Sequence, residues 1–419
     1  MTGFVWLLVA LEFALLLAFV ALRHRAPAGT PWRLHEAMLA WQTLYFVGAA
    51  AQLTISPGAA TTTFVLLVTI AQLSLTATAL TLCARRRTLP DVPPIMPPVE
   101  TAVAWGLAVA SSLVCLAFVV AILRNEELLL ILAGVLTGDE RFLDFRTTMT
   151  SGTAVYLAPG YVKQFRDVLL PGSLIALVAF TGRPRWWLIV PMGLVGFGAA
   201  ILSGERFSLM VYILAFGFAL ALRPDSRRAA LRVVAPVFAL VLFTAFVAST
   251  VLLGRSSEDS SLLTVIGEAA VALFDRIVLT LPRENAGGFG IWQPLAPTWG
   301  QNWLSAISGI LPGAQTGLDQ DLHEVLGGSA MGSSPLGLAP DAYLAWGMLG
   351  IVICPALYCL LLDRADTALV DSASPLAKAL RIALLPLCFA WYSPFLFLLN
   401  GGAVLVGGAV AIALWRRVR

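Results

Sequence analysis

Long runs of apolar residues recur along almost the whole chain, and they constrain its fold more than any other feature. A helix needs about 20 mostly apolar residues to cross a bilayer, and reading the sequence with that window predicts about eleven spans. Hydrophobic residues make up 59% of the chain and charged residues only 12%, a balance typical of integral membrane proteins. The predicted spans lie at 3–22, 36–55, 61–83, 101–123, 167–182, 187–203, 207–222, 233–253, 339–361, 380–399 and 401–415.

Backbone polar groups inside lipid must be hydrogen-bonded within the protein, and at these segment lengths that requirement favours helices over a barrel. The sequence therefore predicts an all-α, polytopic helical bundle that forms a single integral membrane domain over residues 1–419.

Basic residues gather in alternate connections between the spans, and this pattern predicts the orientation. Short cytoplasmic loops retain Lys and Arg, whereas exported loops are depleted of them. An outside N-terminus and an inside C-terminus put most of the 27 basic residues inside, with 84–100 as a cytoplasmic connector. The topology rule gives no reason for the basic residues that then face outward: Arg124, Arg141, Arg146, Lys163, Arg166, Arg206, Arg255, Arg276 and Arg283.

Polar chemistry concentrates in two outer loops, 124–166 and 254–338, and in the short passage "SGERFS", which contains Glu205 and Arg206. The second loop is the dominant polar interval of the chain, and it includes helix-like amphipathic stretches. In one of them, the spacing of Glu268, Asp275 and Arg276 puts their side chains on one helical face. We expect the chemistry of the protein to lie in these outer segments.

Outward arginines suit a ligand that carries phosphate, because the guanidinium group binds phosphate oxygens bidentately and stays charged near lipid. The alternative is that these arginines extend to lipid headgroups or pair with nearby carboxylates. We favour this structural interpretation for Arg124, Lys163 and Arg283. The functional interpretation is favoured for the arginines beside apolar stretches: Arg141, Arg146, Arg206 and Arg276.

His323 is the histidine of the outer segments, and it lies among Asp319, Asp321 and Glu324. An imidazole in this setting can take a proton from an attacking hydroxyl group near neutral pH. A solvated loop histidine is the alternative. The sequence has no metal-ligand spacing and no Gly-rich phosphate loop with a Lys, so it predicts neither a metal nor a nucleotide cofactor. The net charge of +3 comes mostly from inner-loop arginines and does not indicate a nucleic-acid partner.

Three passages carry a family resemblance: "GSSPLGLAPDAYLAWGMLGIVI", "LSGERFSLMVYIL" and "RTTMTSGTAVYLAPGYVKQFRDVLLPG". The first, with Asp341 and Tyr343, resembles the start of a late span in the Wzy-type O-antigen and oligosaccharide repeat-unit polymerases. The second is similar to the segment in which that family, and the related O-antigen ligases, present an arginine, here Arg206. The third is similar to the family's first large outer loop. The many spans, the late outer loop and the inside C-terminus also match the family's layout.

The resemblance implies glycosyl transfer at the periplasmic face of the bacterial inner membrane. A growing polyprenyl-diphosphate-linked oligosaccharide is the donor, and a single lipid-linked repeat unit is the acceptor. Arg206 and Arg276 would then stabilise the departing donor diphosphate, while Arg141 and Arg146 hold the acceptor. The lipid bilayer and a chain-length regulator are the other expected partners.

The expected catalytic base is His323 or, failing it, Glu324 or Asp319. The remaining candidate substrate-binding residues are Arg166, Glu205, Arg255, Asp341 and Tyr343.

Trp292, Trp299 and Trp303 are candidates for stacking on sugar faces, and an interfacial aromatic belt is the alternative. Two other activities stay open. One is the O-antigen ligase. The other is a transporter that flips a lipid-linked glycan, which predicts charged residues along the inner half of the bundle and helices broken near the midplane.

Overall fold

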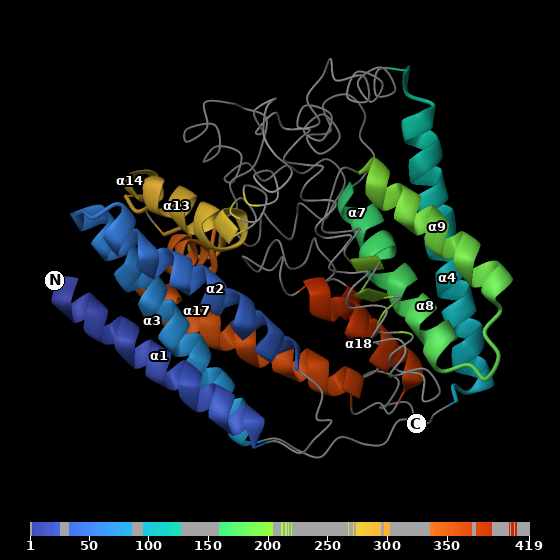
Figure 1. The fold of residues 1–419 in the computed structure, drawn as a ribbon, viewed down its shortest axis with the longest axis horizontal. Coiled ribbons are helices and arrows are strands. Elements are labelled where there is room, and N and C mark those ends of the chain that lie inside the picture. The colour runs from blue at the N-terminus through green and yellow to red at the C-terminus, as the bar shows by residue number, and fades with distance from the viewer. Residues whose placement is uncertain are drawn as a thin grey trace. The chain divides into compact units, whose positions relative to one another are not determined.

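The computed structural model describes residues 2–25, 33–85, 95–126, 159–203, 274–294, 297–301, 336–370 and 374–387, together with scattered positions within 211–219, 267–271 and 402–408. All regular secondary structure in these residues is helical, which confirms the all-α prediction (Figure 1). They divide into two compact units, one built from Met1–Leu89, Phe274–Thr367 and Cys388–Leu398 (unit 1), the other from Pro90–Leu273, Ala368–Leu387 and Leu399–Arg419 (unit 2).

In unit 1, three long helices from the start of the chain pack with segments from much later in the sequence. Its helices are α1 (Thr2–His24), α2 (Leu34–Ile55), α3 (Ala59–Ala84), the π-helix η2 (Asp275–Leu279), α13 (Thr280–Gly287), α14 (Phe289–Trp292) and most of α17 (Leu338–Val370). α3 packs against α1 and α2, while η2 and α13 lie against α2.

Unit 2 is assembled from the middle of the chain and a late helix. It contains α4 (Pro98–Leu123), α7 (Pro159–Lys163), the π-helix η1 (Gln164–Leu169), α8 (Leu170–Ala179), α9 (Trp186–Leu202) and α18 (Pro375–Leu387). α4 packs against α8 and α9, and α18 packs against α8.

Four described helices are long and apolar enough to cross a membrane: α1, α3, α4 and α17. α1 and α4 also expose many large apolar side chains, which is the surface that lipid would cover. These helices fit a multi-pass membrane protein. The predicted spans at 207–222, 233–253, 380–399 and 401–415 lie partly or wholly outside the described residues, so the count of eleven stays a prediction.

α2 forms a 22-residue helix where a span was predicted, but its most apolar stretch is less apolar than those of α1, α3, α4 and α17, and it is not among the helices apolar enough to cross a membrane. The reason is its position, because α3, η2 and α13 all pack against it. Its polar residues Glu36, Gln42 and Gln52 are buried in protein. A helix surrounded by protein does not need the apolar content of one that faces lipid.

Polar side chains join the helices of unit 1 at mid-length. The hydroxyl of Thr76 in α3 donates a hydrogen bond of 2.5 Å to the carboxylate of Glu12 in α1. Gln72 in α3 donates to the hydroxyl of Thr43 in α2, at 3.4 Å. Glu12 is fully buried, as expected for a carboxylate inside an apolar span.

In unit 1, contacts show which connecting segments lie at the same end of the helices. At one end, Arg23 at the close of α1 pairs with Glu36 at the start of α2, at 3.6 Å. At the other end of α2, Tyr45 donates to Asn285 of α13, at 3.3 Å. The connectors predicted to be inside thus meet at one end of the unit, and the late outer loop returns to the opposite end. This grouping agrees with the predicted alternation, while the assignment of the cytoplasmic end stays a prediction.

The contacts of unit 2 follow the same alternation. The backbone N–H of Met96, before α4, donates to the carbonyl of Phe180, after α8, at 2.8 Å. The carboxylate of Glu100 accepts hydrogen bonds from the Ser374 hydroxyl (2.8 Å) and the Leu376 N–H (3.3 Å), at the start of α18. Three segments predicted to face the cytoplasm therefore share one end of this unit.

Gly48 allows the close approach of α2 to η2. A Cβ atom at this position would lie 1.8 Å from the backbone carbonyl oxygen of Val278, which cannot move without shifting η2. We expect Gly48→Ala to destabilise the protein by about 1–3 kcal/mol, the usual range for overpacking a filled contact. The measurement is the thermal unfolding midpoint of the detergent-solubilised protein. Gly106→Ala is the matched control, since a Cβ there meets nothing within 4 Å, and an equal loss in both variants would contradict the prediction.

Candidate functional site

The end of unit 1 that is predicted to face outward contains two described parts of the loop predicted at 254–338. On one side are η2, α13, α14 and residues 297–301; on the other are residues 336–347, which lead into α17. α14 rests on α3, and η2 and α13 rest on α2. The helix that contains Arg276 and the passage "GLAPDAYLAWG" therefore meet on the same framework of helices. We refer to this region as the outer-end site.

Asn285 joins these two parts of the loop. Its side-chain oxygen accepts hydrogen bonds from the backbone N–H of Gly337 (2.8 Å) and the hydroxyl of Tyr45 (3.3 Å). Its backbone carbonyl accepts a hydrogen bond of 2.9 Å from the indole N–H of Trp292. The residue is fully buried, so these contacts are shielded from water. They fix where α17 begins relative to α13.

An aromatic cluster around Trp292 packs next to these contacts. The ring of Trp292 packs edge-on against Phe289, Tyr343 and Phe64, with centroid separations of 5.1, 5.8 and 6.4 Å. Trp292 is only 2% exposed, so its indole is a core element and its surface does not reach a ligand. Tyr343 is half-buried against it. Asp341 is buried near the start of α17, five residues before the helix breaks at Trp346 and Gly347.

Arg276 lies in η2, and its backbone position is described although its side chain is not. The neighbouring Asp275 carboxylate is paired with Arg283 at 2.7 Å, and it also accepts a hydrogen bond from the Thr280 hydroxyl at 3.0 Å. Arg283 thus has a local carboxylate partner, as its structural interpretation requires. Short π-helical stretches are frequent at functional sites, because the extra residue in the turn changes the direction of the side chains.

Arg166 lies in η1 of unit 2, where it is 2% exposed. Its Nε and Nη2 atoms donate to the two carboxylate oxygens of Asp167, at 2.7 and 2.9 Å. Its carbonyl accepts a hydrogen bond of 2.6 Å from the Tyr212 hydroxyl. The guanidinium group therefore already holds a carboxylate in the bidentate geometry that a phosphate would use. Its candidate role in substrate binding stays a prediction.

Most of the other predicted site residues lie outside the described part of the chain. These are Arg141, Arg146, Glu205, Arg206, Arg255, Asp319, His323 and Glu324, together with Trp303. Their roles stay predictions.

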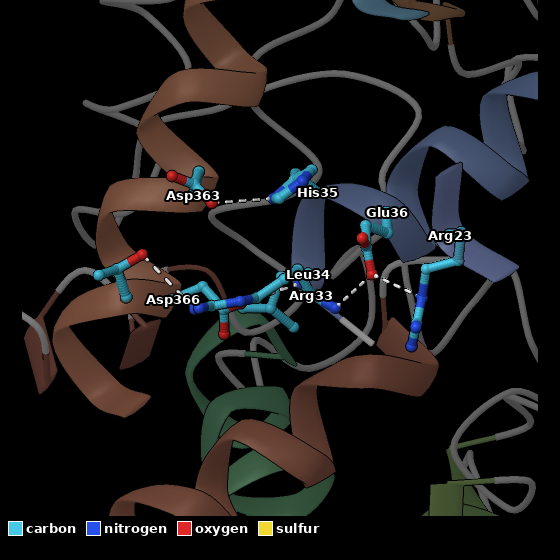
Figure 2. A network of polar contacts seen from close by, with 8 residues as sticks. Arg23, Arg33, Leu34, His35, Glu36, Asp363 and Asp366 are labelled. Atoms are coloured by element: carbon cyan, nitrogen blue, oxygen red, sulfur yellow. Dashed lines mark hydrogen bonds and ion pairs between the residues drawn. The ribbon is translucent and has the colours of Figure 1, made fainter. Parts of the chain in front are cut away.

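A second polar site, which the sequence analysis did not single out, lies at the opposite end of unit 1 (Figure 2). The Nδ1 atom of His35 in α2 lies 3.2 Å from a carboxylate oxygen of Asp363 in α17. One helical turn further along α17, Asp366 accepts a hydrogen bond of 3.3 Å from the backbone N–H of Leu34 and lies 3.7 Å from Arg33. We refer to these residues, with Arg23 and Glu36, as the inner-end network.

The inner-end network also shapes the start of α2. The Glu36 carboxylate accepts a hydrogen bond of 2.9 Å from the backbone N–H of Arg33, which caps the helix, and it pairs with Arg23 (Figure 2). Glu36, Asp366 and His35 are almost completely buried. The signal in the sequence was the spacing of Asp363 and Asp366, which puts two carboxylates on one face of α17. Their partners are more than 300 residues away in the chain, so spacing alone did not identify them.

The described residues contain no group of three or more His, Cys, Asp or Glu side chains placed to hold a metal ion. Comparisons with protein-family models, with curated proteins and with solved structures gave no match to this chain. The chemistry of the residues and the resemblance of the three passages are therefore what indicates a function.

Proposed function

We propose that this protein is a membrane glycosyltransferase that polymerises polyprenyl-diphosphate-linked oligosaccharide repeat units at the periplasmic face of the bacterial inner membrane. Its product would be O-antigen or a capsular or exopolysaccharide. The observation that supports this most is the assembly of the outer-end site. The Asn285 hydrogen bond to Gly337 brings the helix of Arg276 to the passage that resembles the polymerases, although the two residues are 52 positions apart.

The reaction needs charge stabilisation more than covalent chemistry. An acceptor hydroxyl attacks the anomeric carbon of the donor sugar, and the bond from that carbon to the diphosphate oxygen breaks. The polyprenyl diphosphate leaves with the electron pair, and the proton of the hydroxyl passes to a base. Arg276 and Arg206 stabilise the negative charge on the leaving diphosphate, and His323, Glu324 or Asp319 takes the proton.

A lipid-linked glycan transporter is the second candidate, because unit 1 buries charged groups at mid-length and at the end predicted to face the cytoplasm. These are the intramembrane Glu12 and the inner-end network. Charged groups in such positions often mark transport pathways. In the network, however, the charges pair with one another across α1, α2 and α17, an arrangement that holds the helices together at this end. The break in α17 lies near its outer start, at Trp346 and Gly347, rather than near mid-length.

The test of the proposal is the distribution of glycan lengths in a strain that lacks the protein, compared with the same strain complemented by the wild-type chain. We expect single repeat units in the deletion strain and a ladder of lengths after complementation. The purified protein in vesicles should also lengthen a lipid-linked repeat unit without nucleotide sugars. Full-length chains that stay on the carrier lipid would instead identify a ligase. Repeat units trapped in the inner leaflet would identify a transporter.

A further inference from the structure

Trp299 has an unusual backbone conformation. Its φ is 51°, and among the described residues it is the non-glycine position with a positive φ. For a bulky side chain the left-handed region is sterically disfavoured, and such conformations persist where surrounding contacts hold them, often at ligand-binding positions.

A break in α17 provides those contacts. Trp346 and Gly347 have non-helical backbone angles, so the helix is interrupted directly after Ala345. The carbonyl of Leu344 accepts hydrogen bonds from both the backbone N–H (2.8 Å) and the hydroxyl (3.0 Å) of Thr298, and the carbonyl of Ala345 accepts one from Gly300 (3.0 Å). Carbonyls at the end of a helix lack helical partners, and the turn at 298–300 supplies them.

This turn places two indole rings against each other. The rings of Trp299 and Trp346 are 6.1 Å apart between centroids and nearly perpendicular, at 82°. Gly300, with φ of 82°, lies under the Trp346 ring, where an added Cβ would be 3.1 Å from a ring atom. Trp299 is 69% exposed and Trp346 is 38% exposed. The result is an open corner formed by the face of one indole and the edge of the other.

The corner matches the chemistry of a pyranose ring. A sugar has an apolar face of C–H groups, which packs on an aromatic face, and hydroxyl groups at its rim, which accept hydrogen bonds from an indole N–H. An anchor in the lipid headgroup region would need neither a fixed angle between two rings nor a left-handed backbone at one of them. Trp292, by contrast, is enclosed in the aromatic core and offers no face.

We propose that Trp299 and Trp346 form a binding corner for one pyranose ring of the lipid-linked oligosaccharide. The inference rests on the proposed function, because it takes the substrate class from it. It adds a specific sugar subsite to that function. It also assigns a role to Trp346, which follows the late loop in the sequence, whereas Trp299 lies within that loop. The subsite recognises the sugar and not the diphosphate.

The experiment is a binding titration of the purified full-length protein in vesicles with the soluble repeat-unit oligosaccharide, released from its lipid diphosphate by mild acid. We expect Trp346→Ala and Trp299→Asn each to weaken binding about tenfold, which corresponds to the loss of one aromatic contact. Asn tolerates the left-handed region, so Trp299→Asn removes the indole without adding backbone strain. Trp346→Phe should retain part of the affinity.

Trp187→Ala is the matched control, since Trp187 is 73% exposed and lies on α9. Unchanged affinity in both corner variants, or an equal loss in the Trp187 variant, would overturn the inference. The thermal unfolding midpoint of each variant separates lost binding from lost folding. Binding of the soluble sugar needs no polymerisation. A normal ladder from the wild-type protein, with unaffected sugar binding in the Trp299 and Trp346 variants, would therefore refute the corner alone. Weakened binding in the corner variants, together with a wild-type protein that makes no ladder, would refute the polymerase alone.

Discussion

Replacing Arg276 with alanine is expected to slow glycan polymerisation by a factor of about 10²–10³ and to leave mostly single repeat units. Removing one preorganised hydrogen-bond donor that stabilises a developing negative charge typically has an effect of this size. Arg276→Lys keeps the positive charge but loses the two-pronged donor geometry, so we expect an intermediate rate. The measurement is the initial rate of chain lengthening by the purified protein in vesicles, normalised to the amount of folded protein.

Arg283→Ala is the matched control for Arg276→Ala. Arg283 lies seven positions later on α13, and its ion pair with Asp275 is 2.7 Å long with side chains that are 52% and 37% exposed. Exposed pairs of this kind contribute about 0–1 kcal/mol to stability, so the rate should stay near that of the wild type. Equal losses in the two variants would mean that the folding of the η2 and α13 segment, and not the charge of Arg276, limits the reaction.

The helices that could be predicted from the sequence are those where apolar length alone decides the outcome. The predictions at 3–22, 61–83 and 101–123 agree with α1, α3 and α4 to within a few residues. The prediction at 339–361 found α17 but not its last turns, because Asp363 and Asp366 interrupt the apolar pattern while remaining helical. Their carboxylates face partners on α2, which a hydropathy window does not register.

The break in α17 shows a second limit of the sequence. Proline is the usual cause of a helix break and Pro355 lies inside α17, yet the backbone leaves helical geometry at Trp346 and Gly347. The break depends on hydrogen bonds from Thr298 and Gly300, which come from the far side of the loop.

Burial distinguishes described aromatic and basic residues that the sequence grouped together. Trp292 and Trp299 were equal candidates for sugar stacking, but one is 2% exposed and the other 69%. Arg166 was grouped with the outward arginines, whereas its guanidinium group is buried against the adjacent Asp167. Neither difference has a signature in composition or spacing, because both arise from contacts made in the folded protein.

Replacing Asp366 with alanine is expected to destabilise the protein by about 3 kcal/mol, the lower end of the range for breaking a buried ion pair. Asp366 is fully buried, and its carboxylate lies 3.7 Å from Arg33 and accepts a hydrogen bond from the backbone N–H of Leu34 at 3.3 Å. Alanine leaves the mostly buried Arg33 without this carboxylate, and the donor at the start of α2 also loses an acceptor. The measurement is the thermal unfolding midpoint in detergent.

The loss of stability should depend on how deeply the removed carboxylate is buried, and not on the loss of one negative charge. Asp275→Ala removes a carboxylate from an exposed pair, so we expect a loss below about 1 kcal/mol there. The double variant Arg33→Met and Asp366→Leu should recover much of the stability, because an apolar pair of similar volume carries no desolvation penalty. If Asp366→Ala were no more destabilising than Asp275→Ala, the inner-end network would not hold α2 to α17. Its buried charges would then favour the transporter over the polymerase.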